Sequence, residues 1–336
     1  GSMFDKAQRL VSLSKTICAQ LGISDSRTIE RTALLCKADL TTNLVFEFTE
    51  LQGYIGADYA RVSGEVETVC EGIKEHYFPL NAESETAKGK EGQIVGIADK
   101  IDTIAAVFAE GKKPTGSSDP LGVRRAALGI IRTILANNLK IDLVQLIEET
   151  LLNLPVQFEG SSIVDKFKKA AGDCVGRVSG KVTAEINEFI VQRLIIFLSD
   201  EYPKNVLEAC AANKNPLVDL TDYVERVKVV STLDTPAMLE SANRVSRLLK
   251  EPVSATVNRN LFNVPAENML LEQINTVNAK DYAQYLKQLE EINPSVEKFF
   301  NDVLVMDKDE KIKQNRLALL SLLKQKYDYI CDFSKL

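Results

Sequence analysis

The sequence predicts an all-α fold. Apolar residues recur every three or four positions along most of the 336-residue chain, whereas alternating strand patterns are nearly absent. Several of these periodic runs follow a capping residue or begin with proline, as helices do. Hydrophobic residues make up 45% of the chain and charged residues 26%, a balance that allows a sizeable core, and the length favours two or three domains.

The most regular periodic runs give the predicted helices, at residues 3–21, 27–43, 93–108, 120–136, 184–198, 236–249, 280–292 and 311–330. The fourth has the strongest start signal, because Asp119 can cap it and Pro120 suits the first helical position. The fifth is apolar nearly all round, which predicts a buried helix. Residues 80–92 are polar and contain glycine, which predicts a solvated loop.

The net charge of −6 makes the chain as a whole no polycation. A nucleic acid would therefore have to bind local basic patches rather than a global positive field. No stretch of about 18 uncharged apolar residues occurs, so we expect no membrane span.

The chain has six cysteines and a single histidine, His76. No two cysteines lie within four residues of each other, which excludes a CxxC zinc or redox motif. We expect reduced structural thiols in a cytoplasmic protein. The scarcity of histidine removes most metal sites and most Ser-His or Cys-His catalytic pairs.

The segment 111–119, GKKPTGSSD, is rich in glycine and serine and precedes a predicted helix. Backbone amides at a helix start favour anions, and Lys112, Lys113, Arg124 and Arg125 add positive charge nearby. The spacing is not that of a P-loop. A phosphate contact and a plain turn with a helix cap are both open, and the local residues favour the turn.

Three strings resemble, in their order, the HD phosphohydrolase superfamily: ALLCKAD (33–39), EHY (75–77) and ADKID (98–102). In that superfamily a His, a His-Asp pair and a later Asp hold a metal ion. Here Cys36 and Lys37 stand in place of the pair, and only Asp99 matches. Because lysine repels a divalent cation, we expect a helical scaffold without metal or hydrolysis, and His76 as a packing residue.

Basic residues gather in three places along the second half of the chain. The groups are Lys166, Lys168, Lys169, Arg177 and Lys181; then Arg244, Arg247 and Lys250; and then Lys311, Lys313 and Arg316. The spacing of the second group puts its members on one helix face. Such faces are usually just solvated, but phosphate contacts would use them. The pair Phe299-Phe300 fits a core better than a base-stacking platform.

Longer strings carry a more specific resemblance. KADLTTNLVFEFTELQGYIGADYA (37–60), KPTGSSDPLGVRRAALGIIRTI (113–134) and FFNDVLVMDKDEKIKQNRLALLSLLKQ (299–325) are similar to the β subunit of bacterial two-subunit glycyl-tRNA synthetase. ADKIDTIAAVF (98–108) and the terminal DFSKL (332–336) continue the match in the same order. The resemblance therefore extends over essentially the whole chain.

That resemblance implies three parts: an HD-like helical domain at 3–155, a helical body at 156–230, and an anticodon-binding domain at 231–336 similar to that of arginyl-tRNA synthetase. It also implies an α2β2 enzyme that joins glycine to its tRNA. Glycine activation with ATP and Mg would belong to the separate α subunit, so no catalytic residue, metal or cofactor is expected here. A full β subunit is about twice as long, and its other half would meet the α subunit.

Under this resemblance, the face with Arg244, Arg247 and Lys250 is the leading candidate for anticodon contact. Arg316 is second, with Lys311 beside it. Lys112, Lys113, Arg124 and Arg125 are candidates for contacts to the tRNA backbone elsewhere. Two alternatives remain: a metal-dependent phosphohydrolase on the HD-like scaffold, and a purely structural scaffold for the α subunit.

Overall fold

The computed structural model describes residues 2–112, 114, 119, 121–154, 175–249, 251 and 253–336, with the side chains of 175–179 left out. The regular structure in this part of the chain is helical, with no strand, which confirms the predicted all-α fold. Within the same ranges, no helix combines the length and apolarity that a membrane crossing requires.

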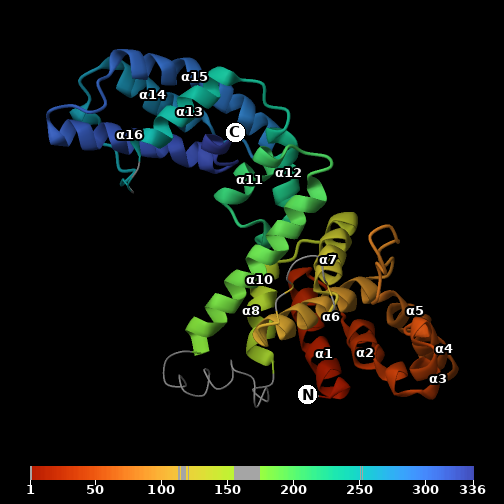
Figure 1. Ribbon diagram of the computed structural model, residues 1–336. Coiled ribbons are helices and arrows are strands. Elements are labelled where there is room, and N and C mark those ends of the chain that lie inside the picture. Colours follow the sequence, from red (N-terminus) through yellow and green to blue (C-terminus); the bar gives the residue numbers. More distant parts are fainter. Residues whose placement is uncertain are drawn as a thin grey trace. The chain divides into compact units, whose positions relative to one another are not determined.

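The chain divides into two units (Figure 1). The first comprises residues 1–197 and 217–221, and the second comprises 198–216 and 222–336. The predicted division into three domains, with boundaries at 155/156 and 230/231, stays a prediction.

The first unit is built around one helix. Its helices are α1 (Met3–Gln20), α2 (Arg27–Leu35), α3 (Asn43–Glu47), α4 (Tyr54–Val62), α5 (Glu67–Glu75), α6 (Lys90–Ala109), α7 (Val123–Asn137), α8 (Leu143–Asn153) and all but the last residue of α10 (Val175–Leu198). Two 3₁₀ turns, η1 (Ala38–Thr41) and η2 (Thr49–Leu51), flank α3. Helix α6 packs against α1, α2, α5, α7 and α8 (Figure 1).

Helix α6 can hold this position because it is apolar along several faces. Ile94, Ile97, Ile101 and Ile104 are each at most 1% exposed. Glycine also lets α5 and α6 approach closely: a Cβ on Gly72 would lie 2.5 Å from the Cβ of Glu91. The predicted helix at 93–108 is therefore confirmed, and its burial places the polar residues of α6 inside the unit.

Three predicted boundaries in this unit are wrong. Helix α10 begins at Val175 rather than at 184, and the prediction that it is buried all round is also wrong, because Ile196 is 57% and Phe197 39% exposed. The helix predicted at 27–43 ends at Leu35, because Asp39 and Thr42 use their side chains on backbone N–H groups, those of Gly53 and Val45. The helix predicted from 120 begins at Val123 behind Gly122, which has a φ of 66°. Asp119 still caps it, since its carboxylate accepts from the backbone N–H groups of Arg124 and Arg125.

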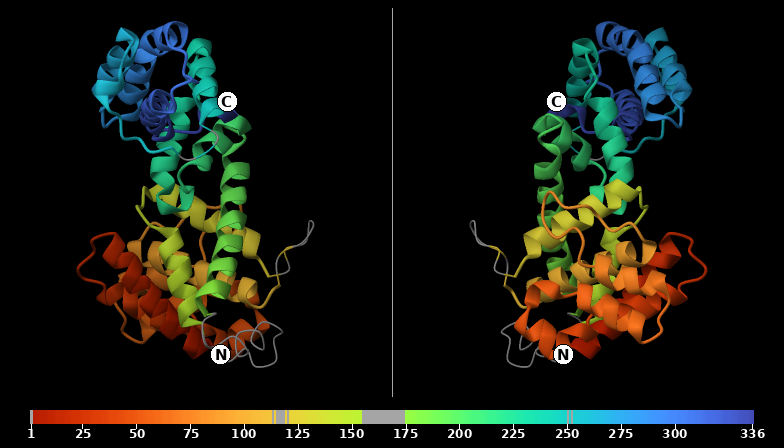
Figure 2. Two further views of the ribbon diagram at one scale, coloured as in Figure 1. Left: turned by 90° about the vertical axis from the view of Figure 1, so that its left-hand side faces the viewer. Right: turned by 90° about the vertical axis from the view of Figure 1, so that its right-hand side faces the viewer.

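The second unit is a helical bundle with a 3₁₀ turn at its end. Its elements are α11 (Lys204–Ala212), α12 (Leu220–Val230, from Asp222), α13 (Pro236–Leu248), η4 (Arg259–Leu261), α14 (Pro265–Thr276), α15 (Tyr282–Asp302), α16 (Glu310–Asp328) and η5 (Phe333–Lys335). Helix α14 packs against α15 and α16, and α13 packs against both of the latter (blue and teal in Figure 2). Helix α15 runs ten residues past the predicted end at 292, through Pro294, because Val296, Phe299 and Phe300 continue its buried stripe.

The described cysteines are buried and form no disulfide, as expected for structural thiols: Cys18, Cys36, Cys70, Cys210 and Cys331. Cys174 lies outside the described residues.

A buried arginine joins three segments of the second unit. Arg226 on α12 is 1% exposed, and its Nη1 donates to the carbonyl oxygens of Cys210 at 2.7 Å and Ile330 at 2.9 Å. Its Nε donates to Asp222 at 3.1 Å. The guanidinium thus links the C-terminal half of α12 to α11 and to the residues that follow α16.

We predict that Arg226→Met lowers the free energy of unfolding of the second unit by about 3–5 kcal/mol, because two buried carbonyl oxygens lose their donor and Asp222 loses its buried ion-pair partner. The half-exposed Lys214 pairs with the same Asp222 at 2.8 Å and serves as control. Lys214→Met is expected to cost at most about 1 kcal/mol. Urea unfolding followed by circular dichroism measures both, and equal costs would contradict the assigned role of Arg226.

Candidate functional site

A groove of about 850 Å³ runs along the first half of α16 in the second unit. Its walls are the end of α13, residues 251 and 253–261, and α16. The polar lining consists of Arg247, Glu251, Ser254, Thr256, Asn258, Lys311, Lys313, Gln314 and Asn315. The apolar lining consists of Leu248, Val253, Leu261, Met306, Leu317 and Ala318.

Two of the predicted cations meet at this groove. Arg247, near the end of α13, and Lys311, in the first turn of α16, both line it and are exposed. Neither side chain forms an ion pair with a residue that the structure describes. Lys313 lines the groove as well, but its Nζ is 3.0 Å from Glu310. The groove therefore offers two unpaired positive charges from helices far apart in the sequence.

The segment that forms one wall is fixed to α16 by an amide. The side chain of Asn315, 5% exposed, accepts from the backbone N–H of Asn258 at 2.7 Å and donates to its carbonyl at 3.0 Å. Ser321 adds a bond to the carbonyl of Val253 at 3.1 Å. Sequence reasoning missed Asn258 and Asn315. The one signal in the sequence was Asn315 itself, a polar amide two residues before the apolar run of α16 that begins at Leu317.

Arg316 does not face the groove, which corrects our expectation for it. Its side chain is 3% exposed, and Nε lies 2.8 Å from the fully buried Glu267. Nη1 donates to Asp307 at 2.7 Å and to the carbonyl of Leu304 at 2.9 Å, and Nη2 donates to Asn263 at 2.6 Å. Four of its five N–H groups are thus engaged within the unit. Because the side chain is only 3% exposed, Arg316 is not presented to a nucleic acid. It holds the start of α14 and the loop before α16 together.

Arg244 is exposed on α13 but is not among the groove residues. Its guanidinium carbon lies 4.3 Å from the centre of the Phe300 ring, a cation–π contact. Phe299 and Phe300 are buried, which confirms that they belong to the core. Lys250 lies outside the described residues. Of the two members of the predicted face that the structure describes, Arg244 and Arg247, Arg247 lines the groove and Arg244 does not.

The cations predicted beside the glycine-rich loop stand apart in the first unit. Lys112 is exposed and pairs with Glu110 at 2.6 Å, and the exposed Arg125 lies 3.8 Å from Asp119. Arg124 is partly buried. Because the Asp119 carboxylate already accepts from the N–H groups that open α7, the helix-cap alternative is supported over an anion site there. Lys113 and residues 115–118 lie outside the described part.

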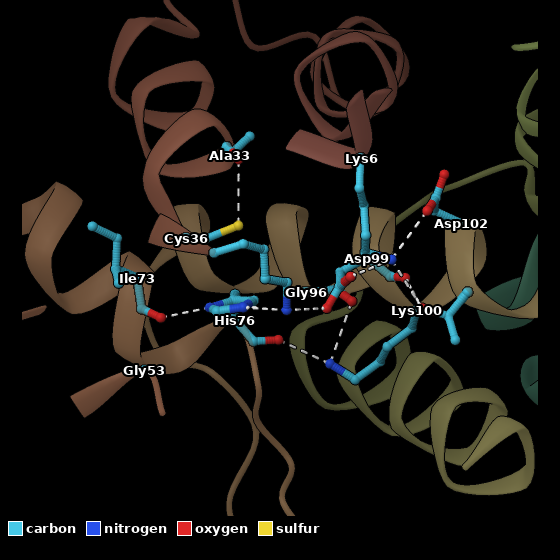
Figure 3. A network of polar contacts seen from close by, with 12 residues as sticks. Lys6, Ala33, Cys36, Gly53, Ile73, His76, Gly96, Asp99, Lys100 and Asp102 are labelled. Atoms are coloured by element: carbon cyan, nitrogen blue, oxygen red, sulfur yellow. Dashed lines mark hydrogen bonds and ion pairs between the residues drawn. The ribbon is translucent and has the colours of Figure 1, made fainter. Parts of the chain in front are cut away.

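The residues of the HD-like resemblance do meet, around a lysine (Figure 3). The Nζ of Lys37 lies 2.8 Å from Nε2 of His76 and 2.7 Å from Oδ2 of Asp99. It also lies 4.0 Å from the centre of the Tyr77 ring. The other oxygen of Asp99 is 2.8 Å from Nζ of Lys6 on α1. Burial alone would lower the pKa of Lys37, but the Asp99 carboxylate raises it above its usual 10.5, so Lys37 stays charged.

The hydrogen bonds of His76 fix its tautomer. Nδ1 faces the carbonyl of Ile73 and must donate, which leaves Nε2 to accept from Lys37. The imidazole is fully buried, and burial together with the nearby Lys37 ammonium holds its pKa well below 6.5. It is therefore neutral at physiological pH and fully engaged in packing, as the sequence analysis expected.

This centre does not fit a divalent ion. Lys37 uses the free lone pair of His76 and one oxygen of Asp99, and its ammonium would repel a metal. Among the described residues, no group of three or more His, Cys, Asp or Glu side chains is arranged to hold a metal ion. The arrangement can stabilise the unit, but it offers no metal-activated water.

Comparison with known proteins relates the two units to one family. The DALR anticodon binding domain matches residues 261–327, a range that includes α14, α15 and most of α16. The chain therefore belongs to the class of proteins that contain an anticodon-binding domain, and the domain lies in the second unit. The family model of the glycyl-tRNA synthetase beta subunit matches residues 1–212.

The glycine–tRNA ligase beta subunits of Trichodesmium erythraeum and Geotalea daltonii are each 34% identical to the chain over its whole length. The one from Coxiella burnetii is also 34% identical. This chain belongs to the glycyl-tRNA synthetase beta subunit family. It spans about half the length of the curated relatives it matches, 49% and 48% for the first two.

The single histidine makes a pH prediction simple to test. Below pH 6.5 the imidazole gains a proton in the unfolded chain but not in the folded one, so stability falls as pH falls. We predict a loss of about 1 kcal/mol between pH 6.5 and 5.5, and a slope that approaches about 1.4 kcal/mol per pH unit at lower pH. His76 faces Lys37 from the end of α2, Asp99 and Lys100 from α6, and its neighbour Tyr77, and none of these titrates in that range. In proton NMR, the one imidazole resonance of the folded chain should not shift from pH 7.5 to 5.5; a midpoint near 6.5 would refute the assignment.

Both Arg316 and Lys311 were predicted to contact nucleic acid, but we predict that substituting them changes the free energy of unfolding by very different amounts. Arg316→Met leaves the carboxylate of Glu267 buried without its cationic partner and is expected to cost about 3–5 kcal/mol. Lys311→Met removes an exposed side chain and should stay within about 0.5 kcal/mol of the parent chain. Urea unfolding decides, and an unchanged midpoint for Arg316→Met would contradict the buried role.

Proposed function

We propose that this chain is the tRNA-binding part of the beta subunit of glycine–tRNA ligase. The observation that carries the proposal is the groove of the second unit, where Arg247 and Lys311 stand unpaired at the edge of the matched anticodon-binding domain. Its polar lining suits the phosphates and base edges of single-stranded nucleotides.

The groove has the chemistry that unpaired bases require. Arg247 and Lys311 supply charge for two phosphates, while amides and hydroxyls such as Asn258, Gln314 and Thr256 can bond base edges. The apolar wall, which includes Met306, can cover a base face. Because Glu251 lies in the same lining, the groove is not uniformly positive and would select for base contacts as well as charge.

In this proposal the chain supports ATP-dependent attachment of glycine without performing it. The chemistry, with ATP and Mg, belongs to the α subunit of a cytoplasmic α2β2 enzyme. Lys112, Lys113, Arg124 and Arg125 are proposed to contact the tRNA backbone elsewhere, and the exposure of Lys112 and Arg125 favours those two.

The test is binding of tRNA for glycine to the full chain, followed by fluorescence anisotropy between 50 and 200 mM salt. We predict that Arg247→Glu with Lys311→Glu lowers the affinity about 10-fold or more. It should also reduce the slope of log affinity against log salt by about 0.7 for each lost phosphate contact.

The control carries the same change of charge outside the groove. Lys287→Glu with Lys298→Glu alters two exposed lysines of α15, and its affinity should stay within about 2-fold of the parent chain. Equal losses in the two double variants would show that total charge, not the groove, sets binding. A folded chain that binds no tRNA at 50 mM salt would refute the proposal and favour a purely structural scaffold.

A further inference from the structure

The polar centre of the first unit joins four helices through charged side chains and one neutral imidazole (Figure 3). Lys6 and Arg9 reach in from α1, Lys37 from the end of α2, and His76 from the end of α5. Asp99 and Asp102 on α6 form ion pairs with the three cations. In the HD superfamily, which the strings at 33–39, 75–77 and 98–102 resemble, the ligands at these places in the sequence hold a divalent ion. Here the cation at the centre is part of the chain itself.

We propose that the Lys37 ammonium is a built-in replacement for the metal ion of the HD scaffold, so that the first unit assembles around a lysine and does without a metal. The contacts meet what a central cation must provide. One Nζ bonds the imidazole of His76 and the carboxylate of Asp99 at 2.8 and 2.7 Å and lies over the Tyr77 ring.

The other cations of the centre pair with the carboxylates that would otherwise be available to a metal ion. Asp99 lies between two ammonium groups, because Lys6 holds its second oxygen at 2.8 Å. Asp102 is occupied by Arg9 at 2.6 Å and Lys6 at 3.0 Å. Each carboxylate that could ligate a metal from α6 is therefore already neutralised by a side-chain cation. A divalent ion would have to displace Lys37, whose side chain is only 6% exposed.

A second lysine holds the turn that presents His76. The Nζ of Lys100 donates to the carbonyl oxygens of His76 and Phe78 at 3.0 Å each and of Gly96 at 3.3 Å. Glycine makes this path possible: a Cβ on Gly96 would lie 2.7 Å from the His76 oxygen, and one on Gly129 would lie 2.9 Å from Cε of Lys100. Three carbonyl oxygens around one point could also bind a free cation, and here the ammonium of Lys100 occupies that point.

The test compares variants of the full chain by differential scanning calorimetry, with EDTA, Mn²⁺ or Co²⁺ added. The transition of the first unit is the one that Arg226→Met leaves unmoved. For the parent chain, we expect the midpoint to stay within about 1 °C in all three conditions. Lys37→Met should lower it by about 10 °C, with no recovery from either ion, because methionine removes the cation and Asp99 stays buried.

Lys37→Asp is the decisive variant. It puts a carboxylate beside His76 and Asp99, a nitrogen and oxygen set that suits Mn²⁺ and Co²⁺. We expect a lowered midpoint that Co²⁺ raises by at least about 4 °C, together with the visible absorption of protein-bound Co²⁺. If this variant is recovered unfolded, Co²⁺-dependent refolding followed by circular dichroism replaces the midpoint.

Lys74→Met on α5 is the matched control, since the one ion pair of Lys74 with a described residue is with Glu71, and both side chains are partly exposed. Its midpoint should change by at most about 2 °C. The proposal is overturned if EDTA destabilises the parent chain, if Lys37→Met is as stable as Lys74→Met, or if neither ion affects Lys37→Asp. None of these outcomes depends on tRNA binding, so the two proposals fail separately.

Discussion

The contact between the Lys37 ammonium and the Asp99 carboxylate is the interaction on which the first unit depends. A charge inside a protein is tolerated only when a partner and further hydrogen bonds replace water. Here the partner is Asp99 on the central helix α6, and the further bonds come from His76. The same pair fixes the neutral imidazole, holds the end of α2 against α6, and leaves no place for a metal ion.

In the second unit, the buried charges that need such partners belong to arginine side chains. Arg226 ties α12 to α11 and the chain's end, and Arg316 ties Glu267 at the start of α14 to Asp307. A guanidinium has five donors in one plane, so it can serve several backbone and carboxylate acceptors at once. The exposed cations Arg247 and Lys311, by contrast, form no ion pair with a described residue. One wall of the proposed nucleic-acid groove is held to α16 by the hydrogen bonds of Asn315 and Ser321.

The helices were largely predictable, because a 3.6-residue apolar period reports which face of a segment is buried. The runs that became α1, α6, α13 and α16 show this clearly, since their ends agree with prediction within a few residues. The end of α2 was not predictable. It depends on where the side chains of Asp39 and Thr42 find backbone N–H groups, and in the case of Asp39 the acceptor and donor are fourteen residues apart. The site was predicted less completely: Arg247 and Lys311 reached one groove, whereas Arg316 turned inward and Asn258 and Asn315 were missed.

The sequence by itself determined an all-helical protein with one histidine and with strings typical of the glycyl-tRNA synthetase beta subunit family. It also determined which lysine and arginine side chains could be candidates for contact with a nucleic acid. Only the tertiary structure decided which of them are exposed, because Lys311 and Arg316 stand on one helix yet one faces solvent and the other meets Glu267. The physical reason is that burial and pairing of a charge depend on residues distant in the chain, whose approach no local pattern records.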